Sequence, residues 1–196
     1  MGLKKTVYSV LILSSAENFT ASLSALLSPA EYAPLCCAES VSAAKRLTNE
    51  RQFDFVIINS PLPDENGMDF ACRLSEKSDS AILLFARADV FSAAYEKLTP
   101  FGVFTLNKPV ARDMAMTALL WLAAARERLR KNEQKSISIE EKMKEIRTVN
   151  RAKWLLIERE GMSETEAHRH IEKLAMDRCL PKSTIAGEII ENFSER

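Results

Sequence analysis

The sequence has little glycine, and it lacks any long apolar run. Five glycines among 196 residues leave few sites for tight turns, and the second half is rich in Glu, Lys, Arg, Leu and Ala, which favour helix. The longest apolar stretch, near Met114–Ala125, is too short to span a bilayer, and no signal peptide is visible. We therefore expect no membrane association and a cytoplasmic protein.

Residues for metal, disulfide or catalytic chemistry are also scarce. The four cysteines form no CxxC pair and no Cys/His cluster with zinc spacing, so we predict reduced thiols. His168 and His170 are the only histidines. On a helix, this spacing points them about 200° apart, so a shared metal ion is not expected. No paired carboxylates, nucleophile–base set or phosphate loop is present, so we predict neither an enzyme nor a cofactor.

The composition nevertheless supports a folded chain of more than one part. Hydrophobic residues make up 46%, enough for a buried core, and the length suits one ordinary domain followed by a small one. The net charge is zero, with only a small excess of basic residues after residue 125. That excess is a weak indication of nucleic-acid binding, which would require the cations to gather on one face.

Short apolar runs alternate with helical segments through the first part of the chain. Strand-like runs cover residues 6–13, 53–58, 81–85 and 103–106, with a further short strand near 32–37, and helical character covers 18–27, 66–75 and the residues from about 112. Such alternation predicts parallel βαβ units with helices on both faces of the sheet. Chemistry in such sheets lies at the carboxyl ends of the strands.

The residues that follow these runs resemble the receiver domain of response regulators, over about residues 5–122. In Phe53–Gly67 (FDFVIINSPLPDENG), an apolar strand leads to Asn59 at the phospho-accepting position, with Pro63 four and Gly67 eight residues later. Leu106–Pro109 (LNKP) resembles the end of the last receiver strand. The resemblance implies a flavodoxin-like, doubly wound parallel sheet.

The set of residues that carries receiver phosphorylation is degenerate. The amide of Asn59 cannot form an acyl phosphate, and Ser14 and Ser15 replace the acidic pair that would hold Mg²⁺. Phe85 stands where the family has a switch hydroxyl, so only Lys108 matches. We predict a pseudo-receiver in which Asn59 hydrogen-bonds its own loop and Lys108 is a strand-end remnant. Any input would then come from an unknown protein or small molecule.

The residues that follow Ala111 contain no proline or glycine as far as Asn132, and they favour a helix. Beyond that point, the sequence allows two continuations. Either one helix runs through, or it breaks at 136–138, where Ser138 and Glu141 form a possible capping box. A heptad pattern favours a dimerising helix pair over a solvated interdomain helix. Its a and d positions are Leu122, Ala125, Leu129, Asn132, Ser136, Ile139, Met143, Ile146 and Asn150.

Three short helices are predicted at the end of the chain. Lys142–Ile157 is amphipathic and ends before Gly161, and Ser163–Glu166 (SETE) is a capping box that starts the next helix. Pro181 precedes the last helix, which carries Ile185, Ala186, Ile189 and Ile190.

This part of the chain resembles the ANTAR class of RNA-binding antiterminators over about residues 140–190. The matching segments are Arg151–Gly161 (RAKWLLIEREG), Ser163–Ala167 (SETEA), Ala175–Met176 and Ile185–Ala186. Trp154 departs from the family, which has glycine there, and either covers the core or alters the RNA-binding face. The resemblance implies a three-helix bundle extended from a coiled coil. The predicted domains are therefore a receiver at 1–122, a helical linker at 123–139 and an ANTAR-like domain at 140–196.

The resemblance implies binding of paired RNA hairpins in nascent transcripts by a homodimer. Lys153, inside the matched segment, is the first choice among the phosphate-contacting cations, although each of them can equally be a solvated surface charge. His168 or His170 either stacks on a base or is partly buried. A DNA-binding regulator and a protein-interaction adaptor are the alternative functions. The other predicted RNA-binding residues are Arg147, Arg151, Arg169, Lys173, Arg178 and Lys182.

Overall fold

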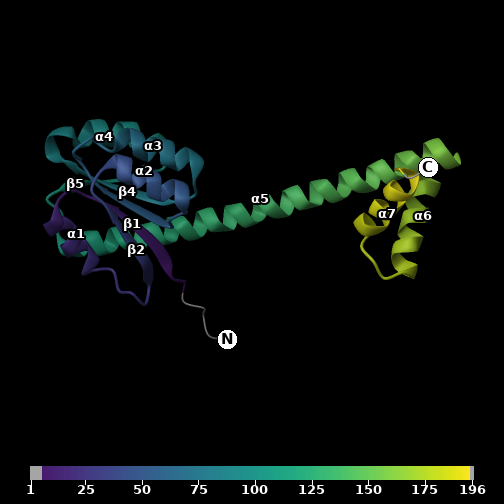
Figure 1. Ribbon diagram of the computed structural model, residues 1–196, viewed down its shortest axis with the longest axis horizontal. Coiled ribbons are helices and arrows are strands. Elements are labelled where there is room, and N and C mark those ends of the chain that lie inside the picture. The colour runs from purple at the N-terminus through teal and green to yellow at the C-terminus, as the bar shows by residue number, and fades with distance from the viewer. Residues whose placement is uncertain (1–5, 195–196) are drawn as a thin grey trace. The chain divides into compact units, whose positions relative to one another are not determined.

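The protein divides into two compact units, which the computed structural model describes over residues 6–194. The α/β unit ends at Lys131 and the helical unit begins at Asn132, inside the predicted linker 123–139. Figure 1 shows a sheet flanked by helices in the first unit and helices without a sheet in the second. None of the helices within residues 6–194 is both long and apolar enough to cross a membrane.

The α/β unit contains a five-stranded sheet in which all neighbouring strands run parallel, in the order β2-β1-β3-β4-β5. The crossovers make this the doubly wound, receiver-like sheet that the sequence predicts. β3 and most of β4 are buried on both faces, which explains their continuous apolar sequences. The strands are β1 (Tyr8–Leu13), β2 (Tyr32–Ala38), β3 (Phe55–Asn59), β4 (Ala81–Arg87) and β5 (Phe104–Lys108).

Helices cover both faces of this sheet. α2 (Val41–Glu50), α3 (Met68–Lys77) and α4 (Phe91–Leu98) pack on one face, and α1 (Glu17–Ser24) and the first part of α5 (Arg112–Glu160) pack on the other (Figure 1). Two short 3₁₀ turns, η1 (Ala88–Val90) and η2 (Thr99–Phe101), flank α4. Because alternate strand residues point to opposite faces, the sheet separates two apolar cores.

The sequence analysis did not predict α2 and α4, and local signals existed for α2. Ser40 caps α2 by accepting a hydrogen bond from the backbone N–H of Ala43 at 3.2 Å. Asp64, distant in sequence, accepts the backbone N–H groups of Val41 and Ser42, both at 2.9 Å. The helix start therefore depends partly on a long-range contact.

Two predicted helix boundaries were wrong for identifiable reasons. The helix predicted over 18–27 ends at Ser24, because Leu26 and Leu27 form tighter bonds to carbonyls three residues back. The helix predicted from Asn66 begins at Met68, after Gly67 adopts a left-handed conformation with φ of 79°. A Cβ at Gly67 would lie 2.9 Å from Ile58 Cγ2, so this turn requires glycine.

α5 is one continuous helix from Arg112 to Glu160, which confirms the first of the two predicted continuations. The break at 136–138 does not occur, so Ser138 and Glu141 are interior helical residues and not a helix start. The beginning of the predicted heptad is also wrong, because Leu122 is fully buried in the α/β core and Ala125 packs against it. An exposed face on which two helices could pair is therefore limited to the heptad positions after Ala125.

The helical unit packs α6 (Glu164–Asp177) and α7 (Lys182–Ser194) against the end of α5. Gly161 ends α5 with φ of 69°, and Ser163 and Glu166 form the predicted capping box, in which each side chain hydrogen-bonds the other residue's backbone. Of the apolar positions predicted for the last helix, Ile185, Ala186 and Ile189 lie in the core of this unit and Ile190 packs against it. The other core residues are Ala152, Leu156, Ala167, Ile171 and Ala175.

Candidate functional site: a closed strand-end network and a cationic helical surface

The carboxyl ends of the strands bring together three of the predicted receiver remnants. Asn59 Nδ2 donates to Ser14 Oγ at 3.0 Å, and Lys108 Nζ donates to Asn59 Oδ1 at 2.7 Å. Lys108 Nζ also donates to the carbonyl oxygen of Ser60. Asn59 and Ser14 are buried, so the network satisfies polar groups that water hardly reaches.

Asn59 therefore bonds across the strand ends, to Ser14 and Lys108, and not within its own loop as the sequence analysis predicted. Burial, and to a smaller extent the charge of Arg87, lower the pKa of Lys108. Ser15 is exposed and outside the network. Phe85 pairs with Asn59 in the sheet register and packs its ring edge-on against Phe19 at 5.1 Å, which leaves no hydroxyl at the switch position.

The residues at the strand ends do not fit the Mg²⁺ ion that receiver phosphorylation uses. The polar groups there are a hydroxyl, an amide and an ammonium group, whereas Mg²⁺ prefers carboxylate oxygens. The nearest loop carboxylates have other partners. Backbone N–H groups of Ser42 and Val41 lower the pKa of Asp64 to about 2, and Glu65 pairs with Lys45 at 2.8 Å.

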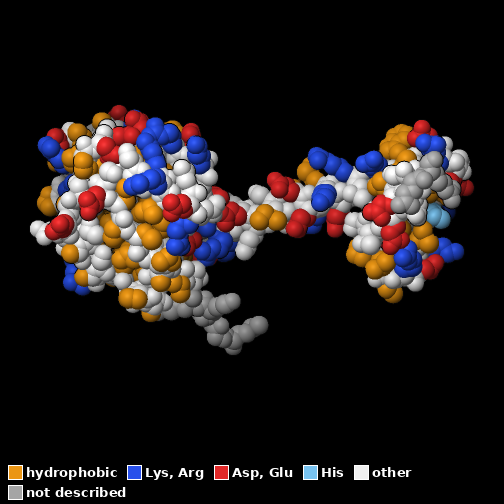
Figure 2. Space-filling model, viewed as in Figure 1, with side chains coloured by type: hydrophobic (Ala, Val, Ile, Leu, Met, Phe, Trp, Pro, Cys, Tyr) orange, Lys and Arg blue, Asp and Glu red, His pale blue; other side chains and the backbone are white. Residues whose placement is uncertain are grey.

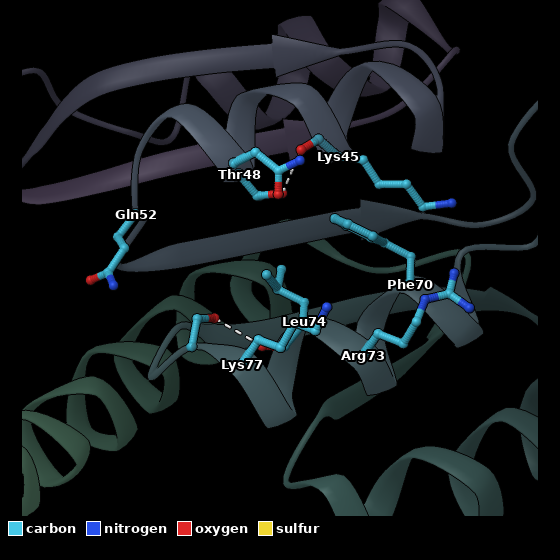
Figure 3. A pocket seen from close by; sticks show the side chains of 9 residues that line it. Lys45, Thr48, Gln52, Phe70, Arg73, Leu74 and Lys77 are labelled. Carbon is cyan, nitrogen blue, oxygen red and sulfur yellow. Dashed lines mark hydrogen bonds between the residues drawn. The ribbon is translucent and has the colours of Figure 1, made fainter.

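A cationic cleft of about 320 Å³ lies between α2 and α3 in the α/β unit. Figure 3 shows Lys45 and Arg73 at one end of this cleft, on either side of Phe70, and Gln52 at the other end. Lys77 is the third cation of the lining, which contains no carboxylate. Glu65 partly neutralises one end, because it pairs with Lys45 and, at 3.6 Å, with Arg73. The sequence analysis missed this cleft, since its residues come from separate helices.

Three of the seven predicted RNA-binding cations form ion pairs inside the helical unit. Lys153 Nζ lies 3.2 Å from Glu164 Oε1, and its side chain is only 17% exposed. Lys153 shares its side of α5 with the apolar residues Ile146 and Val149, so it does not lie on a purely polar side of the helix. The other two pairs are Arg178 with Glu188 and Lys182 with Glu172.

The remaining four cations, Arg147, Arg151, Arg169 and Lys173, are exposed. No ion pair of theirs occurs within residues 6–194. Arg169 and Lys173, one turn apart on α6, line a shallow depression together with His170. The predicted cations of the helical unit therefore lie at several separate positions and do not form one basic patch. Figure 2 likewise shows basic, acidic and apolar side chains interspersed along the exposed part of α5.

The aromatic side chains that the sequence analysis discussed lie on the surface. Trp154 is 69% exposed, so the alternative in which it covers the core is wrong. His170 is exposed, and His168, 48% exposed, lies 3.2 Å from Glu172, so the predicted partial burial of a histidine in the bundle is also wrong. These rings are accessible to a ligand.

The ANTAR domain sequence model matches residues 138–190, which are the helical unit with the last part of α5. The chain carries an ANTAR domain. Its α/β unit has the receiver fold: the signal receiver domain of an HD domain-containing protein from Pseudomonas fluorescens superposes with a TM-score of 0.57. That match has 24% identity and covers 68% of this chain and 96% of the other.

Two curated relatives extend this comparison. The transcriptional regulatory protein PdtaR of Mycobacterium tuberculosis is 26% identical over 153 residues, covering 71% of this chain and 68% of the relative. The aliphatic amidase regulator of Pseudomonas aeruginosa is 32% identical over 91 residues, covering 46% and 45%. The chain therefore joins a receiver fold to an ANTAR domain.

Proposed function

We propose that this protein is a transcription antitermination regulator that binds paired RNA hairpins through its ANTAR domain. The ANTAR match over residues 138–190 is the observation that supports the proposal. By holding one RNA fold, the protein would prevent a terminator hairpin from forming and so let transcription continue. The names of its relatives, a transcriptional regulatory protein and an amidase regulator, agree with a regulatory role.

The unpaired cations are the groups best suited to contact RNA phosphates. Arg147, Arg151, Arg169 and Lys173 need not give up an ion pair to bind phosphate. Lys153, Arg178 and Lys182 must exchange a carboxylate partner for a phosphate, which reduces their net contribution. Each phosphate contact releases counterions, so the affinity should fall steeply with salt.

Electrophoretic mobility of the full chain tests this proposal. We expect a shift with an RNA that carries two hairpins and no comparable shift with duplex DNA of the same length. Arg169→Ala with Lys173→Ala should weaken the RNA complex, whereas the control pair Arg46→Ala with Arg112→Ala, two exposed cations of the α/β unit, should not. A shift with DNA alone would favour a DNA-binding regulator, and no shift with either would favour a protein-interaction adaptor.

We further propose that the receiver domain takes its input by binding a ligand and not by phosphorylation. The cleft between α2 and α3 suits a small anionic molecule, because Arg73 and Lys77 can meet its charge while Phe70 and Leu74 provide an apolar surface. Calorimetry with AMP as the probe should detect binding that Arg73→Ala with Lys77→Ala removes. No heat from AMP or inorganic phosphate would contradict this assignment of the cleft.

A further inference from the structure

Trp154 is a large aromatic side chain on the surface of α5 with no structural task in its own unit. Its side chain is 69% exposed, while Ala152 and Leu156, close to it in sequence, are buried in the core of the ANTAR domain. With about 100° between successive residues, Trp154 points away from that core. An indole left in water forgoes the stabilisation that burial would give, and its exposed ring is available to a binding partner.

Two arginines share this face of the helix with Trp154. Arg151 precedes the tryptophan by three residues and Arg147 precedes it by seven, so the three side chains lie along adjacent turns. Neither arginine has an ion pair within the described residues, and both are exposed. Glu158, one turn further on, is the next acidic residue on this side and pairs with neither arginine. The face is therefore an aromatic ring beside two free guanidinium groups.

We propose that Trp154 is a base-stacking site for an unpaired nucleobase of a hairpin loop, with Arg147 and Arg151 on the neighbouring phosphates. This inference rests on the proposed RNA-binding function and assigns one of its contacts. Hairpin loops expose unstacked bases, and proteins bind these by stacking them on aromatic rings. Stacking tolerates any base, because every base has a π-face, so Trp154 would add affinity more than sequence preference.

The other possible occupant of this face is a second copy of the chain. The exposed apolar stripe of α5, with Ile139, Met143 and Ile146, lies next to the tryptophan and is the better surface for such pairing. In a parallel two-fold pair, each residue approaches its own copy. A seam through Arg147 and Arg151 would then oppose like charges, which is unfavourable. The charge of the face thus favours a polyanion over a second helix.

Tryptophan fluorescence gives a direct test, because the chain has two tryptophans. In a Trp121→Phe background, Trp154 becomes the single tryptophan reporter of the full-length protein. We would titrate this variant with a two-hairpin RNA selected from a pool with randomised loops. We expect saturable quenching of Trp154 by the RNA, and little quenching by the same RNA annealed to its full complement.

Affinity measurements on matched variants complete the test. Trp154→Ala should weaken RNA binding about ten-fold, while Trp154→Phe, which keeps a ring, should retain most of the affinity. The control Leu120→Ala removes another exposed apolar side chain, 67% exposed on the part of α5 that belongs to the α/β unit, and should leave the affinity unchanged. Circular dichroism would verify that each variant is folded.

The outcomes separate this inference from the function on which it rests. If the protein binds RNA but Trp154 is not quenched and Trp154→Ala binds normally, the stacking site is wrong and the function stands. If Trp154→Ala abolishes self-association and leaves RNA affinity unchanged, the tryptophan belongs to a protein interface and the inference is overturned. If no RNA is bound, both the function and the inference fail.

Discussion

At the scale of single residues, Asn59 determines what the receiver fold can still do. Its amide oxygen accepts from Lys108 and its amide nitrogen donates to Ser14, so both ends of the side chain are used. Receiver phosphorylation needs a carboxylate nucleophile and further carboxylates that would hold Mg²⁺, and this network of a hydroxyl, an amide and an ammonium group contains no carboxylate. In this protein, Lys108 donates a hydrogen bond to the neutral amide of Asn59, where a lysine could otherwise neutralise a phosphoryl group.

We predict that acetyl phosphate with Mg²⁺ adds no phosphate to the protein. The expected result is an unchanged intact mass after an incubation that fully modifies an active receiver run in parallel. The physical reason is that the Asn59 amide cannot attack the phosphodonor as a carboxylate does, so no acyl phosphate forms. A phosphate adduct that maps to Asp64, or to any other residue of the α/β unit, would show that the domain retains phosphotransfer chemistry.

The sequence predicted which residues occupy the strand ends, but not their bonding. Spacing within one motif placed Asn59 and Gly67, and a second short motif placed Lys108. The bond between Asn59 and Ser14 joins two strands 45 residues apart, and no local pattern indicates it. The exposure of Trp154 was equally hidden, because its face depends on how α5 packs in the bundle. Sequence spacing fixed positions here, whereas tertiary packing decided contacts.

At the scale of elements, α5 is held against the sheet by a cluster of charged residues. Asp54 Oδ1 accepts from Arg126 at 2.9 Å and from Arg130 at 3.0 Å, and its other oxygen accepts the backbone N–H of Ser9 at 2.9 Å. Tyr8 donates to Glu127 on the same helix at 3.2 Å. The Asp54 side chain is only 15% exposed, so these bonds are poorly screened by water.

We predict that Asp54→Asn destabilises the α/β unit by roughly 1.5–3 kcal/mol at neutral pH, the usual range for a hydrogen bond to a charged group. Burial raises the pKa of Asp54, but the bonds from Ser9 and Arg126 outweigh it and lower the pKa overall. A lowered pKa in the folded state means that the stabilisation is complete above the unfolded value of about 3.9 and is lost as the pH falls below it.

Urea unfolding at pH 7 and at about pH 3 measures this effect. The difference between the natural protein and Asp54→Asn should shrink at the lower pH, because protonation removes the same charge. Asp69→Asn is the matched control, since Asp69 forms only an exposed pair with Lys97 and should change stability little. Equal effects of the two variants would mean that the cluster does not hold α5 in place.

Substitutions at Lys153 and Ala152 distinguish the loss of an RNA contact from a loss of packing within the ANTAR domain. We predict that Lys153→Ala weakens binding of the RNA hairpin pair and lowers the salt slope by about one unit, without unfolding the bundle. Ala152 is fully buried, so Ala152→Glu should instead destabilise the bundle by a few kcal/mol, roughly. Circular dichroism and a salt titration distinguish the two effects. If Lys153→Ala binds RNA with unchanged affinity and slope, its pair with Glu164 is only structural.

The secondary structure shows which elements a sequence can predict. Continuous apolar runs located β1, β3 and β4, because largely buried parallel strands need them. Shorter runs located the edge strands β2 and β5, most of whose residues are half-buried or exposed. α2 and α4 are short and have no such run, and α2 begins with support from the distant Asp64. The continuity of α5 was left open, since Ser136 and Ser138 have lower helix propensity than Ala or Leu and residues 134–147 are exposed, so no buried face marks the helix there.

At the scale of the whole molecule, the exposed part of α5 carries an apolar stripe that a second copy of the chain could cover. Ile139, Met143 and Ile146 are each more than half exposed and recur at three- and four-residue intervals. None of these three side chains belongs to a hydrophobic core of residues 6–194, so the stripe packs against no apolar core there. A regulator that engages two hairpins gains from pairing, because the second contact becomes intramolecular and the avidity rises.

We predict that the full-length chain forms a homodimer through this stripe, detectable by sedimentation at tens of micromolar, roughly, for an interface of ordinary affinity. A fragment ending at residue 118 is a poor control, because it would remove Leu119 and Leu122 from the α/β core. Met143→Glu with Ile146→Glu should yield monomers, since the new charges would face each other across the seam. Gln134→Glu with Ser138→Glu adds the same charge on another face of the helix and should leave the dimer intact. A natural protein that remains monomeric would contradict the predicted dimer. A dimer that tolerates the charges at 143 and 146 would show that its interface lies elsewhere.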